Sequence, residues 1–557
     1  MNPRNVGSEL SKRLLALSAL TGAITGVGVA AFEWVTRDQI FERILGLPLP
    51  AQALFPLVGL ALTAVALATV GRGATAATSD DYIRNFHERG RPLDLKPLPA
   101  RLLGGLATLG TGGALGFEGP SLYLGASVGT LLDRLRPRRS ARGRADSKVL
   151  MVAGAAAGVA AIFKAPATGA IFALESPYRD DNARRMLLPA LLAAATGYLS
   201  AVTLLGTEPL FSVEGTPPFD LRELGGAVVL GLLCGVGARL FAWIIGWAKS
   251  MAATQAGWVR VLVAGGVMAA LVVVSDLLFD EPLATGSGYR TLEWVTEPGH
   301  ALPLVAALFT IRLFATTATV GGGGVGGLFV PLVIAGAVLG DAMSVVVDDR
   351  TTLFPLIGVA AFLGAGYRTP LAGVVFVAET TGRPGFVVPG LIASVASQLV
   401  MGSVSVSKYQ IAGRAGHLER RLRLPVTSAL DADVLAVPAD ADLASFHEHH
   451  LLARRQLDVP VVDANRYLGM LTVGAVGQVP REEWSERSAG EMADTHWPVG
   501  RLTWALEDAV RAMNEHEVET LPIVDDGQFV GVVTMSGLLH LDEILDSGEA
   551  RPGPGTP

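Results

Sequence analysis

The sequence predicts an all-α polytopic membrane protein followed by a small cytosolic α+β domain pair. Three features predict this: a low content of charged residues, long apolar runs, and a change of charge near Pro425. Half of the 557 residues are apolar and 17% are charged, against roughly 25% in soluble globular proteins. A soluble core of this size would need more charge at its surface, so we expect a membrane domain over residues 1–424.

Apolar runs recur between Leu14 and Leu399. Each is long enough, or nearly so, to cross a bilayer, which needs about 20 residues. The first run follows Arg4, Lys12 and Arg13 as a secretory signal would, but no small-residue cleavage site follows, so we expect a helix of the mature protein. Further runs cover Ala53–Val70, Val149–Leu174, Met186–Leu205, Gly225–Trp247, Val261–Leu278 and Ala301–Val320.

The acidic tail is expected on the cytosolic side of the membrane. From Val426 onward the chain has 23 acidic and 8 basic residues, a net charge of −15, and the remainder has 28 acidic and 36 basic residues, a net of +8. Basic clusters lie at Arg134–Lys148 and Arg420–Arg423, just before the tail. The positive-inside rule places both clusters in the cytosol. Because basic clusters beside membrane spans are explained by topology, we expect no nucleic-acid binding there.

The sequence shows no enzyme chemistry. The apolar segments contain no nucleophile–base pair and no metal cluster, and the single Cys234 excludes an intramolecular disulfide. His447, His449 and His450 lack further ligands at suitable spacing, so we interpret them as a solvated helix face. We therefore expect neither an enzyme nor a required metal or cofactor.

One carboxylate interrupts the apolar run from Leu102 to Leu132. Glu118 lies in the segment Gly116–Pro120, and a charge in the bilayer core is costly unless it is offset. Proline favours the first turn of a helix, and glycine lets the backbone approach closely. We therefore expect Glu118 at a helix N-terminus, where free N–H groups favour negative charge. A site that accepts a carboxylate also accepts an anion.

The membrane part repeats itself. The segment Gly154–Ser176 matches Gly358–Thr380 in the second half of the membrane domain. A second match, upstream of the first, pairs Gly116, Pro120, Gly125 and Gly129 with Gly327, Pro331, Gly336 and Gly340. Segments interrupted by Gly and Pro at matching places in two halves are typical of transporters whose site lies between the halves.

The tail repeats as well, with a constant spacing between its two copies. Asp458–Thr472 and Thr520–Thr534 each contain two β-branched runs joined by a turn. An amphipathic helix such as Ala505–Glu515 completes a βαβ-like unit. We expect one module at 425–484, a second at 485–547 and a disordered tail at 548–557.

Taken in order, these motifs resemble the CLC family of chloride channels and proton-coupled chloride transporters over residues 14–424. Gly116–Pro120 matches G-x-E-G-P, Gly327–Pro331 matches G-x-F-x-P, and Gly286–Tyr289 and the repeated FKAP and YRTP segments also fit. The tail resembles a pair of CBS modules. The resemblance implies a CLC-type inverted repeat with broken helices, and a homodimer with one anion pathway per subunit.

The resemblance also assigns the site. Glu118 would be the gating glutamate, which blocks when deprotonated and lets chloride and related anions pass when protonated or displaced. The backbone of both broken helices would bind the anion, through Gly116, Phe117 and Gly119 in the first and Gly327, Leu328, Phe329 and Val330 in the second.

The sequence departs from the family at both side chains that would face the anion. The early G-S-G-x-P segment is replaced by Ala76–Asp81, where Thr78 or Ser79 could supply the hydroxyl, although Ser79 is equally a helix N-cap. The family's tyrosine near the end of the membrane domain has one nearby counterpart, Tyr409. That residue is equally an interfacial anchor.

A third departure bears on mechanism. Proton-coupled members carry an inner glutamate directly after the residue that corresponds to Glu175, and Ser176 stands there in this chain. Serine cannot relay a proton as a carboxylate does. We therefore favour channel-like chloride conduction. The alternative is a proton-coupled antiporter with another inner proton path, and a membrane-anchored sensor acting through the tail is more distant.

CBS pairs often bind adenine nucleotides, with an Asp two residues after a Thr contacting the ribose. Thr472 and Thr534 are present, but Gly474 and Ser536 replace the acid. This weakens the prediction of an adenine nucleotide site at Thr472 and Thr534 and favours a structural or dimerising tail.

Overall fold

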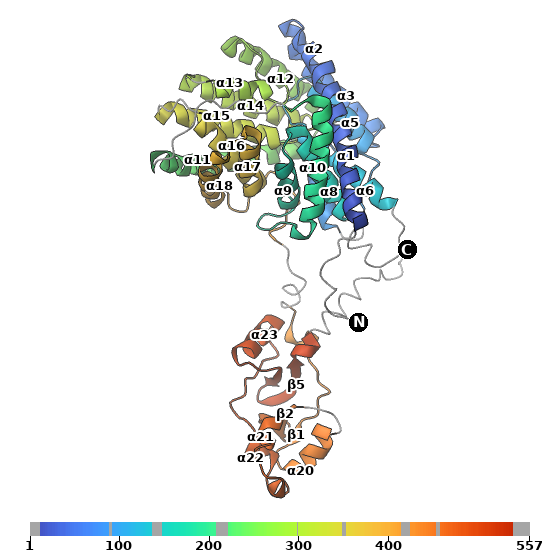
Figure 1. Ribbon diagram of the computed structural model, residues 1–557, viewed down its shortest axis with the longest axis vertical. Coiled ribbons are helices and arrows are strands. Elements are labelled where there is room, and N and C mark those ends of the chain that lie inside the picture. Colours follow the sequence, from blue (N-terminus) through green and yellow to red (C-terminus); the bar gives the residue numbers. More distant parts are fainter. Residues whose placement is uncertain are drawn as a thin grey trace. The chain divides into compact units, whose positions relative to one another are not determined.

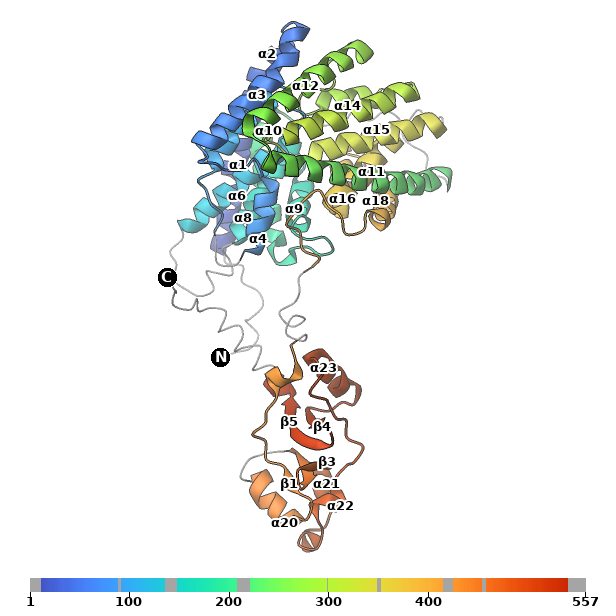
Figure 2. The same cartoon turned by 180° about the vertical axis from the view of Figure 1, so that it is seen from behind.

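The computed structural model describes residues 12–88, 92–135, 148–207, 221–297, 299–347, 352–413, 424–452 and 457–538. The chain forms two compact units, Met1–Gly413 and Arg414–Pro557. The described part of the first unit is helical, and the strands lie in the second (Figures 1 and 2). The basic residues expected at 136–147 and 420–423 and the tail at 548–557 lie outside the described residues.

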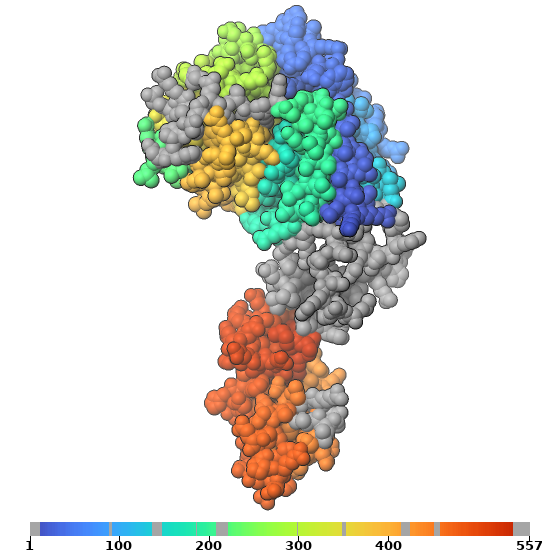
Figure 3. All heavy atoms as spheres, viewed as in Figure 1, coloured from blue at the N-terminus to red at the C-terminus, as the bar shows by residue number. Residues whose placement is uncertain are grey.

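The helices of the first unit run alongside one another. For example, α1 packs along α10, and their blue and green surfaces adjoin in Figure 3. The helices are α1 (Lys12–Trp34), η2 (Val35–Phe41), α2 (Glu42–Leu45), α3 (Leu49–Thr69), α4 (Ser79–His87), α5 (Leu98–Gly110), α6 (Glu118–Arg134), α8 (Val149–Phe163), α9 (Pro166–Glu175), η4 (Arg184–Met186), α10 (Leu187–Leu205), α11 (Leu221–Thr254), α12 (Gly257–Phe279), α13 (Tyr289–Thr296), α14 (Leu302–Gly321), α15 (Phe329–Val347), α16 (Leu353–Tyr367), α17 (Pro370–Thr381), η5 (Pro384–Phe386) and α18 (Val387–Met401).

Eight of the described helical segments are long and apolar enough to cross a membrane. They are Lys12–Leu45, Leu49–Thr69, Leu187–Leu205, Leu221–Thr254, Gly257–Phe279, Leu302–Gly321, Phe329–Val347 and Pro384–Met401. The remaining apolar helices α8, α16 and α17 are shorter. The first unit thus combines full spans with short helices that end inside it.

The run Val149–Leu174, expected as one span, is two short helices. Lys164 adopts a left-handed backbone with φ 52° after α8. Pro166, which lacks an N–H group, then begins α9. The repeat-related break follows α16, where Arg368 has φ 57° and Pro370 begins α17. A long apolar run therefore overstated the helix length because the break lies within the apolar stretch.

Two glutamates lock the paired short helices together. The two oxygens of Glu379 each accept a hydrogen bond of 2.8 Å, from the backbone N–H groups of Ala167 and Thr168 at the start of α9. Glu175 Oε2 accepts one of 2.9 Å from Ala372 N–H at the start of α17. Each carboxylate thus satisfies free N–H groups at the N-terminus of the other half's helix.

The second unit contains a five-stranded sheet of order β1-β2-β3-β5-β4. β1 pairs parallel to β2, and the other pairs are antiparallel. The strands are β1 (Val437–Pro438), β2 (Asp458–Asp463), β3 (Arg466–Thr472), β4 (Thr520–Asp525) and β5 (Gln528–Thr534). The helices are η6 (Val426–Ala429), α20 (Leu443–Phe446), η7 (His447–Leu452), α21 (Val473–Val476), η8 (Arg481–Glu483), α22 (Ala489–Met492) and α23 (Leu506–Glu515).

The sheet reproduces the tail repeat seen in the sequence. In the hairpins β2–β3 and β4–β5, Asp458 pairs with Thr472 and Thr520 pairs with Thr534. The register shifts at the same place in both hairpins, after Val461 and after Ile523. The two hairpins are therefore copies of one unit, as the α+β prediction requires.

Each copy also takes a segment from the other side of the expected boundary at residues 484–485. Pro425 pairs with Ala505, and Asp431 pairs with Val532 of β5. In the other direction, residues 488–494 join the first copy, where Ser488 pairs with Asp442 and Asp494 pairs with Met470. The two copies are interleaved rather than successive.

Candidate functional site

Two broken helices meet at one point inside the first unit. α6 begins at Glu118 and α15 begins at Phe329. Just before them, Gly116 N–H donates to Gly327 C=O at 2.9 Å, and Gly327 N–H donates to Gly116 C=O at 2.8 Å. This antiparallel bridge brings together the N-termini of two helices that belong to different halves of the repeat.

The turns before the two helices are held by repeat-related threonines. The Thr108 hydroxyl accepts a hydrogen bond of 3.0 Å from Val325 N–H in the second half. The Thr319 hydroxyl accepts one of 3.1 Å from Ala114 N–H in the first half. Because each half satisfies a backbone donor of the other, the meeting point is fixed from both sides.

The Glu118 carboxylate lies in this meeting point and is only 1% exposed. Its Oε1 accepts a hydrogen bond from Phe329 N–H, while its Oε2 has no hydrogen-bond partner among the described residues. A Cβ on Gly116 or on Gly327 would overlap the carboxylate. The carboxylate therefore occupies a helix N-terminus of the kind that binds anions.

The side chain of Phe329 packs against other aromatic rings, and its backbone N–H group donates to Glu118 in the site. Its ring stacks on Phe163 with centroids 4.4 Å apart, and it meets Phe376 at 5.0 Å and Phe172 at 5.3 Å, edge to face. On the first half, Phe117 meets Phe32 edge to face with centroids 6.1 Å apart. These rings fix the backbone N–H groups that the sequence analysis assigned to the anion.

Thr78 lies against the first turn of α6. It is buried, and its Oγ1 is 2.6 Å from where a Cβ on Gly119 would lie. α4 begins with Ser79, and its N-cap residue Thr78 makes no capping side-chain bond. The interpretation of Ser79 as the N-cap was therefore wrong, because the helix begins one residue earlier than that interpretation requires.

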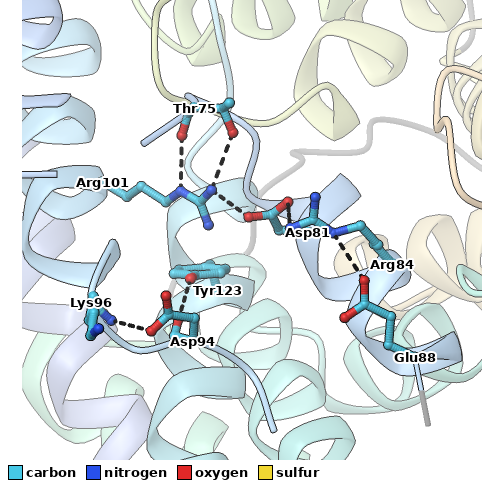
Figure 4. A network of polar contacts seen from close by, with 8 residues as sticks. All are labelled: Thr75, Asp81, Arg84, Glu88, Asp94, Lys96, Arg101 and Tyr123. Atoms are coloured by element: carbon cyan, nitrogen blue, oxygen red, sulfur yellow. Dashed lines mark hydrogen bonds and ion pairs between the residues drawn. The ribbon is translucent and has the colours of Figure 1, made fainter. Parts of the chain in front are cut away.

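A buried arginine holds the loop that carries Thr78 (Figure 4). Arg101 of α5 donates from Nε to Thr75 C=O at 3.1 Å, and its Nη2 contacts Asp81 Oδ2 at 2.5 Å. Its guanidinium lies 4.5 Å from the ring centre of Tyr123 on α6. The loop is thereby tied to the helix that carries Glu118. Sequence reasoning missed Arg101, although a lone arginine inside the apolar α5 was a signal.

A cavity of about 580 Å³ leads to this place. Basic side chains line it together with two acids, Asp80, which pairs with Lys249 at 2.7 Å, and Asp81, which pairs with Arg84 at 3.0 Å. Thr78, Ser79 and Leu328 also line it, but Glu118 does not. The basic residues in its wall are Arg84, Lys249, Arg260 and Lys408. The cavity is thus a positively lined approach that ends beside the α15 N-terminus.

The tyrosine that contacts the α15 N-terminus is Tyr367. Its hydroxyl accepts a hydrogen bond of 3.3 Å from Leu328 N–H, and the residue is 2% exposed. Tyr409, the residue suggested by the sequence, is 42% exposed and lies under the guanidinium of Arg84. Sequence reasoning missed Tyr367 because the repeat matches it with Phe163. The hydroxyl group that distinguishes Tyr367 from Phe163 was the only feature of the sequence that could have pointed to it.

The remaining candidates lie in ordinary structural positions. Ser176 is buried, and its hydroxyl has no hydrogen-bond partner among the described residues. Thr472 accepts from Ala475 N–H at 3.1 Å, and Thr534 accepts from Gly537 N–H at 3.0 Å. Both threonine hydroxyls of the second unit therefore cap the start of a following helical turn.

Comparisons with known proteins match this geometry. The voltage gated chloride channel family model matches residues 58–402, and the CBS domain model matches residues 501–543. The H(+)/Cl(-) exchange transporter ClcA of Citrobacter koseri is 27% identical over 417 residues, which cover 70% of this chain and 85% of the relative. ClcA of Vibrio cholerae serotype O1 is 26% identical over 400 residues, covering 68% and 84%.

Solved structures share the fold. A slow cyanobacterial Cl-/H+ antiporter has a TM-score of 0.62 at 21% identity, covering 71% of this chain and 95% of its own. A CLC-type fluoride/proton antiporter has a TM-score of 0.59 at 22% identity, covering 72% and 100%. A eukaryotic CLC transporter has a TM-score of 0.56 at 18% identity, covering 94% and 98%. The chain is a multi-pass membrane protein that belongs to the voltage gated chloride channel (CLC) family and carries a C-terminal CBS domain.

Proposed function

We propose that this protein moves chloride across a membrane in exchange for protons. One observation carries the proposal: the Glu118 carboxylate accepts a hydrogen bond from the Phe329 N–H group at a helix N-terminus. A carboxylate and a chloride ion compete for the same donors, and a protonated carboxyl group gives them up. Passage of an anion is then coupled to protonation of Glu118.

The comparisons support exchange over the channel-like conduction that the sequence analysis favoured. The ClcA relatives are named H(+)/Cl(-) exchange transporters, and two of the structural neighbours are described as proton antiporters. Channel-like conduction remains the second candidate because Ser176 stands at the position of the inner glutamate.

The two candidates differ in the reversal potential. We would reconstitute the full chain into liposomes, impose a chloride gradient and a pH gradient, and measure the potential at which chloride flux stops. Exchange predicts a potential that shifts with the pH gradient. A potential set by chloride alone would overturn the exchange proposal and favour the channel.

Glu118→Gln tests the gate itself. Glutamine imitates the protonated carboxyl group, so we expect chloride flux to persist and to lose most of its dependence on pH. The matched control is Glu293→Gln, which neutralises an exposed carboxylate on α13. An unchanged pH response in Glu118→Gln would contradict the gating role.

We further propose that the protein is a homodimer and not an enzyme, with the tail as a structural or dimerising unit. The bands of exposed leucine and valine on α10 and α18 support a partner or lipid at these faces. Cross-linking in native membranes should yield a single species of twice the chain mass. Deletion of residues 425–557 that left chloride flux intact would argue further against a membrane-anchored sensor that acts through the tail.

A further inference from the structure

Two side chains cap neighbouring donors at the start of α15. Leu328 N–H donates to the Tyr367 hydroxyl at 3.3 Å, and Phe329 N–H donates to Glu118 Oε1. Because these N–H groups belong to consecutive residues at a helix N-terminus, the two acceptors lie side by side. The phenol of α16 is therefore next to the gating carboxylate of α6.

The phenol is part of the wall that separates Glu118 from the cavity. Tyr367, Ser79 and Leu328 belong to the cavity wall, and Glu118 does not. The Ser79 side chain lies near the Tyr367 hydroxyl. Among the described residues of the cavity wall, Tyr367 is thus the hydroxyl group that touches both the cavity and the donors beside Glu118.

The position of Tyr367 is tightly fixed. Its ring meets Phe172 edge to face with centroids 5.1 Å apart. Gln410 Nε2 donates to its backbone C=O at 2.8 Å and to Ser176 C=O, also at 2.8 Å. Gln410 therefore ties the end of α16 to the residue that replaces the inner glutamate, and the phenol cannot swing freely.

The charged groups around the phenol are paired. Two acids act on the Tyr367 hydroxyl electrostatically, Glu118 of α6 and Asp80 of α4. Asp80 is paired with Lys249 of α11 at 2.7 Å, and the adjacent Arg368 is paired with Asp180. The Oε2 atom of Glu118 has no partner among the described residues. A proton that arrives at the phenol therefore has one open acceptor, the gating carboxylate.

We propose that the Tyr367 hydroxyl passes protons between the cavity and Glu118, the task that Ser176 cannot perform. The proposal rests on the proposed exchange. A protonated water in the cavity, directly or across the Ser79 hydroxyl, gives a proton to the Tyr367 oxygen and becomes neutral water. The original Tyr367 O–H bond breaks in the same step, and its proton bonds to a carboxylate oxygen of Glu118. One proton moves, and tyrosine is regenerated.

The test is Tyr367→Phe in the full chain in proteoliposomes, with Tyr409→Phe as the matched control. We expect Tyr367→Phe to lower proton flux at least tenfold and to shift the reversal potential toward the chloride value. Chloride affinity, measured by calorimetry, should not fall, because the change frees the Leu328 N–H group for the anion. Tyr409→Phe should leave all three quantities unchanged, because its exposed ring lines the same cavity beside Arg84 but, among the described residues, its hydroxyl bonds neither Leu328 nor Glu118.

Tyr367→His separates relay from packing. Histidine keeps a proton donor and acceptor on a ring, so we expect it to restore part of the proton flux that Tyr367→Phe loses. Unchanged coupling in Tyr367→Phe would overturn the relay, and so would a loss of chloride affinity with the exchange ratio intact. Absence of proton coupling in the unmodified protein would instead overturn the proposed exchange, and the relay with it.

Discussion

The two halves of the membrane unit share a backbone at the site but divide its chemistry. Gly116–Pro120 and Gly327–Pro331 are repeat copies, bridged by reciprocal hydrogen bonds between Gly116 and Gly327. The first copy contributes a carboxylate, Glu118. The second contributes the N–H group that the carboxylate occupies, together with a ring, Phe329, that packs into an aromatic cluster. The repeat supplies two helix N-termini. The glutamate in the first copy accepts the hydrogen bond that the second copy would otherwise offer to an anion.

The division predicts that equivalent changes in the two halves have unequal effects. The largest is expected for Gly327→Ala. Its Cβ would overlap the Glu118 carboxylate and lie 2.7 Å from Gly119 N, a backbone atom that cannot yield. We expect at least a tenfold loss of chloride flux together with a lower melting temperature. Gly246→Ala, where a Cβ meets open space, is the control, and equal flux in the two variants would contradict the geometry.

The two glutamates that cap each other's helices, Glu379 and Glu175, should also contribute unequally to the free energy of unfolding. Glu379 accepts three hydrogen bonds, from Ala167 N–H, Thr168 N–H and the Thr168 hydroxyl, and Glu175 accepts one from Ala372 N–H. Each unsatisfied buried donor costs about 1 kcal/mol or more. We expect Glu379→Ala to lower the free energy of unfolding by about 3 kcal/mol and Glu175→Ala by about 1 kcal/mol. Denaturation in detergent would measure both, and the reverse order would refute the interpretation.

Gly116→Ala should act on the gate alone. The atoms nearest to its Cβ all belong to the Glu118 carboxylate, which can rotate away. We therefore expect a folded protein whose chloride flux is less dependent on pH, as in Glu118→Gln. The flux–pH profile of Gly116→Ala and Gly327→Ala side by side is the measurement. A Gly116→Ala profile identical to that of the unmodified protein would show that the carboxylate does not block.

The smallest effect is expected in the tail, where Asp458 occupies the position of Thr520 in the other copy. Burial, and secondarily the nearby Glu519, raise the pKa of Asp458. A raised pKa in the folded state means that this acid contributes stability at low pH and loses it as pH rises through its folded pKa. Asp458→Asn should therefore stabilise the tail slightly above that pH, by about 0.5 kcal/mol. Thermal melts at pH 3, below the unfolded pKa of about 3.9, and at pH 8 should differ less in the variant.

Much of the fold could be predicted because it depends on local signals. Glycine and proline marked the broken helices, and Glu118 begins α6 as its neighbours indicated. The repeats in the membrane unit and in the tail reappear as reciprocal caps, reciprocal turns and matching hairpins. Repeats are visible in sequence because each copy keeps the residues that its own backbone needs.

The groups around the anion path could not be predicted in the same way. Tyr367 reaches Leu328 across 39 residues, and Arg101 reaches Asp81 across 20. Neither contact leaves a periodic pattern. Tyr367 was also hidden by its match to Phe163, because a tyrosine and a phenylalanine pack alike and differ only in the hydroxyl. The single run Val149–Leu174 was wrong for a related reason: composition does not reveal a helix break inside an apolar stretch.

The bridge between Gly116 and Gly327 limits how the site can work. Two hydrogen bonds of 2.9 and 2.8 Å join the halves at the very backbone that presents the donors. The halves therefore cannot rock apart here without leaving buried donors and acceptors unpaired. The path must therefore open by a change in side-chain rotamer, such as that of Glu118. Side-chain rotamers interconvert far faster than domains move. Turnover should accordingly respond little to the thickness or stiffness of the bilayer, and covalently stapling the halves beside the bridge should leave transport intact.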